Sequence, residues 1–150
     1  LAQQDGFTPV TLGFADNSLP FVAETYIVTK DTLASKKDLL KAFLIAEIKG
    51  WTDAVKDPAQ CAKYAALKYG KDQKLDVKEQ TAEAKAQAKL IVSPDTNAHG
   101  LLTMTDDLIA ENIKTLDLMF PKTKVTADQL FDMSLINEVY QENPDLIVSL

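Results

Sequence analysis

The chain has 150 residues, a net charge of −6 and a sequence pI near 4.7. This acidic balance argues against nucleic-acid binding, since no basic stripe exists to meet phosphates, and against a polybasic membrane patch. No apolar run is long enough for a transmembrane helix, and the single cysteine, Cys61, excludes an intrachain disulfide.

The first thirty residues are predicted to be extended. Leu1–Gly6 is expected to be a polar terminus with few contacts to the rest of the chain. Apolar residues alternate in Phe7–Phe14, which is typical of a half-buried strand. Asp16–Pro20 is a turn cluster. The β-branched and aromatic residues of Glu24–Thr29 predict a second strand.

The strongest helix prediction follows. Ser35 is a good N-cap, and the charge of Asp38 suits the positive end of a helix. Apolar residues then recur at three- and four-residue spacing and form one stripe, which consists of Leu40, Phe43, Leu44, Ile48, Trp51 and Val55. Asp57–Pro58 ends this helix and begins the next.

The remaining elements are also helical. A second helix is predicted over Pro58–Tyr69 with Gly70 as its C′ residue, a third over Asp76–Ile91, and a fourth after the cap Thr105, with Asn112 in its stripe. A loop over Ser93–Leu102, a short turn over Thr126–Gln129 and a helix over Ser134–Tyr140 complete the chain. Two or three strands are too few for an independent α/β sheet, yet the helical stripes are strong. A sheet is therefore missing, and the rest of a longer protein or a second copy would supply it.

Three motifs occur in order along the chain. Asp38–Ala54 reads D-L-L-K-A-F-L-I-A-E-I-K-G-W-T-D-A, Ser93–Gly100 reads S-P-D-T-N-A-H-G, and Leu130–Ser134 reads L-F-D-M-S. As a set, over about Gly13 to Asn143, they resemble the C-terminal part of solute-binding proteins of ABC importers. The closest group is the NMT1/THI5-like family, which includes binding proteins for thiamine-pyrimidine precursors, riboflavin, alkanesulfonates and nitrate.

The resemblance implies an α/β fold of the type 2 periplasmic-binding class, present here in part, with this segment mostly α and two or three short strands. Residues 1–22 would then form the end of lobe 2 and a hinge crossover, and 23–150 the return strand and helices of lobe 1. The chain would be about half of the whole protein, with the export signal upstream. The expected function is capture of a solute outside the cytoplasm, in the periplasm or anchored to the outer face of a membrane, and its delivery to ABC permease subunits, without enzyme activity or cofactor.

The candidate ligand-binding residues, given this resemblance, lie at the hinge: Asp16, Asn17, Glu24, Thr25 and Tyr26. A ligand between two lobes is held near the crossover by a few placed polar groups. The Glu24 carboxylate would accept N–H groups of an aminopyrimidine and repel a sulfonate or nitrate. The competing interpretation is that Asp16 and Asn17 only make a turn and that Glu24 begins a strand in solvent.

Other residues carry weaker signals. His99 is the only histidine, which leaves no histidine pair for a metal, and we expect a structural role for it beside Gly100, which is free to take a positive φ. Cys61 is interpreted as a small buried hydrophobe, and Trp51 and Tyr64 as core aromatics. No nucleotide-binding or hydrolase motif is present.

Two alternatives stay open. Fungal pyrimidine-precursor synthases resemble these binding proteins and use a bound pyridoxal cofactor with a cysteine-rich motif and iron; one cysteine and one histidine disfavour that enzyme. A small helical interaction domain is the other, and the strong stripes with too little sheet disfavour it. Alone, the chain is expected to form a homodimer, or a dimer that swaps the arm Leu1–Pro20.

Overall fold

The computed structural model describes residue 2 and residues 5–150, and the chain divides into two compact units. Unit 1 comprises Leu1–Leu33 and Met104–Met133, and unit 2 comprises Ala34–Thr103 and Ser134–Leu150. Leu1, Gln3 and Gln4, which belong to the predicted loose terminus Leu1–Gly6, lie outside the described residues.

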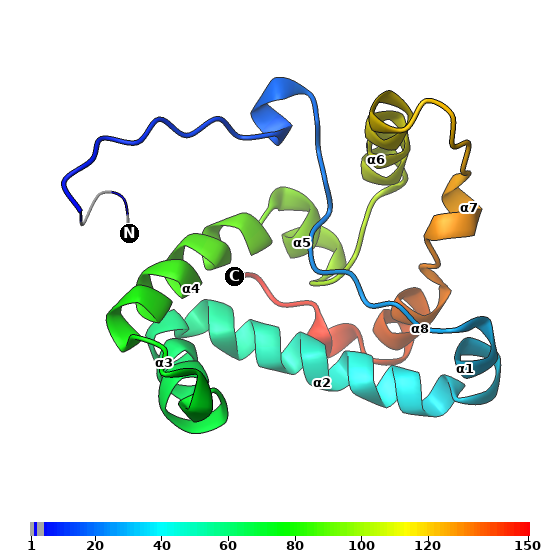
Figure 1. Cartoon of the computed structure of the whole chain (residues 1–150). Helices are drawn as coiled ribbons and strands as arrows, with labels where there is room; N and C mark the ends of the chain where they lie inside the picture. Colours follow the sequence, from blue (N-terminus) through cyan, green and yellow to red (C-terminus); the bar gives the residue numbers. More distant parts are fainter. Residues whose placement is uncertain (1, 3–4) are drawn as a thin grey trace. The chain divides into compact units, whose positions relative to one another are not determined.

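Unit 1 contains one long helix and shorter elements. Its 3₁₀ turn η1 covers Ala15–Asn17, and α6 and α7 cover Asp106–Met119 and Ala127–Leu130. The unit boundary falls within α1, Lys30–Ser35. Unit 2 is helical throughout, with α2 Lys37–Lys56, α3 Pro58–Lys63, the π-helical turn η2 Tyr64–Tyr69, η3 Lys71–Gln73, α4 Val77–Ile91, α5 Pro94–His99, α8 Ser134–Glu142 and η4 Pro144–Leu146 (Figure 1).

The predicted strands are wrong: the residues that the structure describes are mostly helical and contain no β-strand. Phe7–Phe14 and Glu24–Thr29 contain no helical residue, but no strand pairs with either of them. Val10 is 85% exposed and Ile27 is 90% exposed, so neither segment has the buried face that the alternation predicted. A strand is stable only when its backbone N–H and C=O groups form a ladder with a neighbour, and propensity alone does not supply one.

The predicted long helix is confirmed as α2, but its predicted N-cap is wrong. Ser35 is the last residue of α1, and Lys36 occupies the cap position without a side-chain hydrogen bond. The Thr29 hydroxyl instead accepts the Thr32 N–H at 3.1 Å and caps the start of α1, six residues before the predicted cap. A competing cap upstream therefore placed Ser35 at the end of another helix.

Most other helix starts are confirmed by their caps. The side chains of Asp57, Asp76 and Thr105 each accept the backbone N–H three residues on, at 3.0, 2.9 and 3.2 Å. The predicted Ser93–Leu102 loop is partly wrong, because Ser93 caps α5 through a reciprocal pair with Thr96. Short polar side chains at such positions satisfy N–H groups that a helix leaves unpaired.

The second predicted helix changes character at Tyr64, where α3 gives way to the π-helical turn η2. It ends at Gly70 as predicted, but Gly70 has a φ of −106°. A Cβ there would lie 2.6 Å from the Ala65 carbonyl oxygen, so close backbone approach requires the glycine. Tyr64 is 49% exposed, and its assignment to the core is wrong.

The core of unit 2 lies along α2. In this unit α2 contacts α3, α4 and α8, and α3 packs on α4 (Figure 1). Ile48 and Val139 are 1% and 0% exposed. Lys37 pairs with Glu138 at 2.6 Å, and Lys41 pairs with Glu142, which fixes α8 against α2 along its edge.

Tyr140 joins α8 to the turn after α5. Its hydroxyl donates to the Leu101 carbonyl oxygen at 2.8 Å, and burial raises the pKa of this hydroxyl to about 12. Gly100, with a φ of 97°, passes under the ring. The predicted positive φ at Gly100 is confirmed.

The buried Tyr140 predicts a loss of stability at high pH. The unfolded phenol ionises near pH 10, below the folded pKa, so its contribution is complete below pH 10 and is lost between about pH 10 and 12. Urea unfolding followed by the fluorescence of Trp51 should show a midpoint that falls over this range. Tyr140→Phe should be less stable at pH 8 but should fall less steeply; parallel pH profiles would contradict the assignment.

Candidate functional site

The five predicted site residues all lie in unit 1, and all are exposed. Asp16 and Asn17 are in η1, and Glu24, Thr25 and Tyr26 are in the extended segment before α1. Glu24 and Tyr26 each have an interaction partner. The turn and the extended segment therefore form one solvent-facing stretch, to which we restrict the candidate site.

The turn is built by Asn17. Its side-chain amide donates to the Gly13 carbonyl oxygen at 2.8 Å, and the Leu19 N–H donates to the Phe14 carbonyl oxygen at 2.9 Å. Ser18 has a left-handed φ of 59°, which reverses the chain. The amide of Asn17 is thus used locally, as the turn interpretation predicts, whereas the Asp16 carboxylate is exposed on the same turn.

A buried asparagine holds the extended segment. Asn112, on α6, is 4% exposed; its Oδ1 accepts the Val22 N–H at 2.9 Å, and its Nδ2 donates to the Leu108 carbonyl oxygen at 2.8 Å. Phe14 and Phe21 pack edge to face with ring centroids 6.4 Å apart. Asn112 is a positioning residue that sequence reasoning counted only as part of the apolar stripe of α6, although a lone amide in such a stripe is the signal of a buried hydrogen bond.

Replacing Asn112 should release this segment. In Asn112→Leu the Val22 N–H loses its acceptor, which costs about 1–3 kcal/mol. We expect exchange of the Val22 amide hydrogen to become at least fivefold faster, because every 1.4 kcal/mol is tenfold in the opening equilibrium. Thr115→Val removes another buried side-chain hydrogen bond of α6, the one to the Glu111 carbonyl oxygen, and should change the Val22 exchange less; equal effects of the two variants would contradict the role of Oδ1.

Glu24 has a strained backbone. Its φ is 61°, in the left-handed region that side chains other than glycine rarely adopt. Such outliers gather at functional sites, where the surrounding structure holds them in place. Of Glu24, Thr25 and Tyr26 only Glu24 has this conformation, which Ser18, Lys74 and Leu102 adopt elsewhere in the described residues.

Glu24→Gly should stabilise the extended segment by about 1 kcal/mol, because glycine adopts this φ without a steric cost. Hydrogen exchange of the α6 amides in unit 1 should slow about fivefold. The matched control, Glu24→Ala, removes the carboxylate and keeps the strain, so it should give no such gain. A gain in both variants would show that the carboxylate, not the backbone, is the source of the effect.

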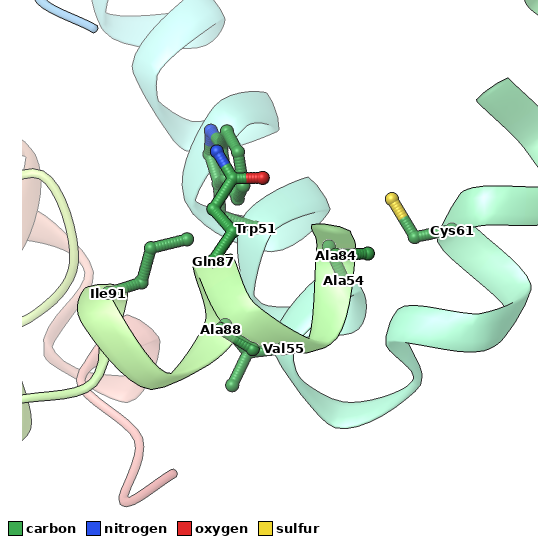
Figure 2. Close-up of a pocket in the computed structure, with 8 residues that line it drawn as sticks. All are labelled: Trp51, Ala54, Val55, Cys61, Ala84, Gln87, Ala88 and Ile91. Atoms are coloured by element: carbon green, nitrogen blue, oxygen red, sulfur yellow. The ribbon is translucent and has the colours of Figure 1, made fainter. Parts of the chain in front are cut away.

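Two hollows lie in unit 2, and neither includes any of the five residues. The first, between α2 and α4, has a volume of about 20 Å³, room for a single water (Figure 2). Trp51 of α2, Gln87 of α4 and Cys61 of α3 are among the residues that line it. Cys61 is therefore partly exposed rather than fully buried, and exposed His99 is not among the lining residues.

The second hollow is larger, about 300 Å³, and open. It is lined by Lys49, Thr52 and Asp53 of α2 and by Asp145, Leu146 and Val148 near the C-terminus. Its volume is at the lower limit of ligand pockets, but its charged side chains are solvent-exposed. We assign no ligand to it.

Residue 2 and residues 5–150 contain neither a group of metal-ligating side chains nor a membrane-spanning helix. Within these residues no three His, Cys, Asp or Glu side chains gather as a metal site. No helix among them has the length and apolar character needed to cross a bilayer.

A family model matches the segment that contains the candidate residues. The family model described as NMT1/THI5 like matches residues 2–61, which include all five candidate residues, α1, α2 and the start of α3. This stretch is therefore consistent with a fragment of an NMT1/THI5-like protein, and the resemblance is confirmed there. No curated protein and no solved structure matches the chain. Beyond Cys61, the resemblance of Ser93–Gly100 and Leu130–Ser134 stays a prediction.

Proposed function

We propose that this chain is part of the solute-binding component of an ABC importer, acting in the periplasm or anchored on the outer face of a membrane. The match of residues 2–61 to the NMT1/THI5-like model carries the proposal, because it covers the turn and the segment expected at the hinge. A small solute binds between two lobes, the hinge closes, and permease subunits receive the solute. No covalent chemistry is required.

The lobes follow from the same family. Residues 1–22 end lobe 2 and form the crossover, and residues 23–150 contribute the return strand and helices of lobe 1. The exposed segments Phe7–Phe14 and Glu24–Thr29 support this division, because they have strand-like composition without a sheet among the described residues. In the whole protein each would add to the sheet of one lobe.

The candidate solutes are a thiamine-pyrimidine precursor, a riboflavin-like molecule, a sulfonate and nitrate. Asp16 and Glu24 are exposed carboxylates on the candidate segment. Negative side chains favour a ligand rich in N–H donors and repel anions. We therefore propose the thiamine-pyrimidine precursor, an aminopyrimidine, as the first of the four solutes to test.

The test uses the gene-encoded protein that contains this chain. Titration calorimetry with the four solutes should give binding of one, and X-ray scattering should show a smaller radius of gyration when it is bound. Glu24→Gln should weaken aminopyrimidine binding about tenfold, since hydrogen bonds to a charged group contribute about 1.5–3 kcal/mol. Glu83→Gln, on α4 in unit 2, is the matched control and should bind normally.

Two outcomes would overturn the proposal. Failure of every solute to bind or to close the protein would remove the transport role. Bound iron, or a pyridoxal absorbance with turnover of that cofactor, would indicate a pyrimidine-precursor synthase instead of a solute-binding protein.

The chain by itself should associate through the arm Leu1–Pro20, of which Leu1, Gln3 and Gln4 lie outside the described residues. Val10 and Leu12 are 85% and 80% exposed on it, and burying them against a second copy is favourable. Sedimentation should show a dimer that the double variant Val10→Lys/Leu12→Lys dissociates. Leu90→Lys, at an equally exposed leucine of α4, is the control; a monomer at all concentrations would contradict the dimer.

A further inference from the structure

An exposed aromatic cluster surrounds a lysine on the π-helical turn η2. Tyr64, Leu67 and Tyr69 are 49%, 62% and 74% exposed. The two tyrosine rings meet at an angle of 65°, with centroids 6.3 Å apart. The Lys68 ammonium lies over both rings, 5.7 Å from the centroid of Tyr64 and 5.1 Å from that of Tyr69.

The π-helical backbone creates this cluster. The Gly70 N–H donates to the Ala65 carbonyl oxygen at 2.8 Å, five residues earlier. This spacing brings residues five apart close to one face, whereas the 3.6-residue turn of an α-helix separates them. Tyr64 and Tyr69 are five apart, so their rings meet only because the helix widens here.

The cluster is also the basic part of an acidic chain. Lys63–Lys74 contains four lysines and one aspartate, a local charge of +3 in a chain of −6. The four lysines, Lys63, Lys68, Lys71 and Lys74, are all exposed. The net charge of the whole chain, which argues against a polybasic surface, therefore conceals one local basic patch.

We propose that this tyrosine–lysine patch, residues 63–74, docks on a membrane surface that contains anionic phospholipid. Tyrosine rings prefer the bilayer interface, where the apolar ring is buried and the hydroxyl stays wet. Leu67 adds an apolar side chain, and lysines reach lipid phosphates while their methylene stems cover apolar surface. The patch lines neither hollow of unit 2 and presents rings and ammonium groups outward, which suits a deformable anionic surface.

The patch shares no residue with the candidate solute site, because residues 63–74 belong to unit 2 and the five candidate residues to unit 1. Membrane docking therefore stands or falls independently of the solute and of the hinge. Docking would hold the protein near a bilayer, and added salt would weaken this contact by screening the charges.

The test is co-sedimentation of the full chain with phosphatidylcholine vesicles that contain or lack phosphatidylglycerol. Binding should require the anionic lipid and should fall as salt is raised. Each lysine near such a surface contributes about fivefold, so Lys68→Gln/Lys71→Gln should weaken binding about 25-fold. Leu67→Gln should weaken binding at constant salt dependence, because it removes apolar contact and no charge.

Matched control variants lie at exposed positions of α4, outside the patch. Lys85→Gln/Lys89→Gln removes the same charge, and Leu90→Gln changes a leucine that is 84% exposed. Both controls should bind within about twofold of the unchanged protein, as expected for surface changes outside the contact. Far-UV circular dichroism should be the same for all variants.

Three results would overturn the proposal: equal binding to neutral vesicles, equal losses in patch and control variants, and no vesicle binding at all. If vesicles are not bound but the chain self-associates, and the patch variants abolish that association, then the patch is an interface with the acidic surface of a second copy.

Discussion

Gly100→Ala should destabilise unit 2 by about 3 kcal/mol or more, because it combines backbone strain with overpacking. Gly100 has φ 97° and ψ 161°, a conformation almost restricted to glycine. A Cβ there would overlap the Tyr140 ring, with Cε1 and the hydroxyl oxygen each 2.5 Å away. The ring cannot move aside without losing its hydrogen bond to Leu101.

Urea unfolding measures this effect in unit 2, because Trp51 is the only tryptophan and lies in that unit. Gly50→Ala is the matched control: Gly50 lies within α2, and a Cβ added to it would meet nothing within 4 Å. That variant should be more stable by about 0.5–1 kcal/mol, since alanine favours a helix interior. A Gly100→Ala protein as stable as the unchanged chain would show that the ring does not hold this turn.

Ile48→Ala should cost about 2–5 kcal/mol, the range for removing a buried isoleucine side chain from a packed core. Ile48 is 1% exposed and is the fully buried residue of α2, the helix that contacts α3, α4 and α8. Its truncation leaves a cavity at the centre of unit 2, and the midpoint of urea unfolding should fall with little change in slope.

Leu39→Ala tests whether that loss is specific to burial. Leu39 lies on the same helix but is 63% exposed, so its truncation should change stability by no more than about 0.5 kcal/mol. Equal losses at the two positions would mean that helix propensity, rather than the core of unit 2, dominates.

The helices of this protein could be predicted because their signals are local. Asp57, Asp76 and Thr105 cap helices through hydrogen bonds to residues only three positions away. A helix satisfies its own backbone, so a stripe and a cap are enough to place it. The prediction of Ser35 as an N-cap failed for the same reason. Thr29 is a second local N-cap, and residue preferences do not decide between the two positions.

The five candidate site residues stay a prediction, and the structure decides only their local geometry. Asn17 was interpreted correctly as a turn former, since its hydrogen bond to Gly13 spans four residues. The hydrogen bond between Asn112 and Val22 spans ninety positions, and no local pattern predicts it. The positive φ of Glu24 likewise has no signal in the local sequence pattern.

Composition, helix caps and apolar stripes thus defined an acidic, mostly helical chain, and the motif of Asp38–Ala54 carried the resemblance to the NMT1/THI5-like family. Tertiary structure decided whether Phe7–Phe14 and Glu24–Thr29 become strands, since β-pairing needs a partner distant in sequence. The sequence patterns also did not predict that the Lys68 ammonium lies over the rings of Tyr64 and Tyr69, because that contact depends on a widened helical turn. Local hydrogen bonds are encoded within a few residues, whereas pairing, strain and surface patches depend on contacts that only the folded chain makes.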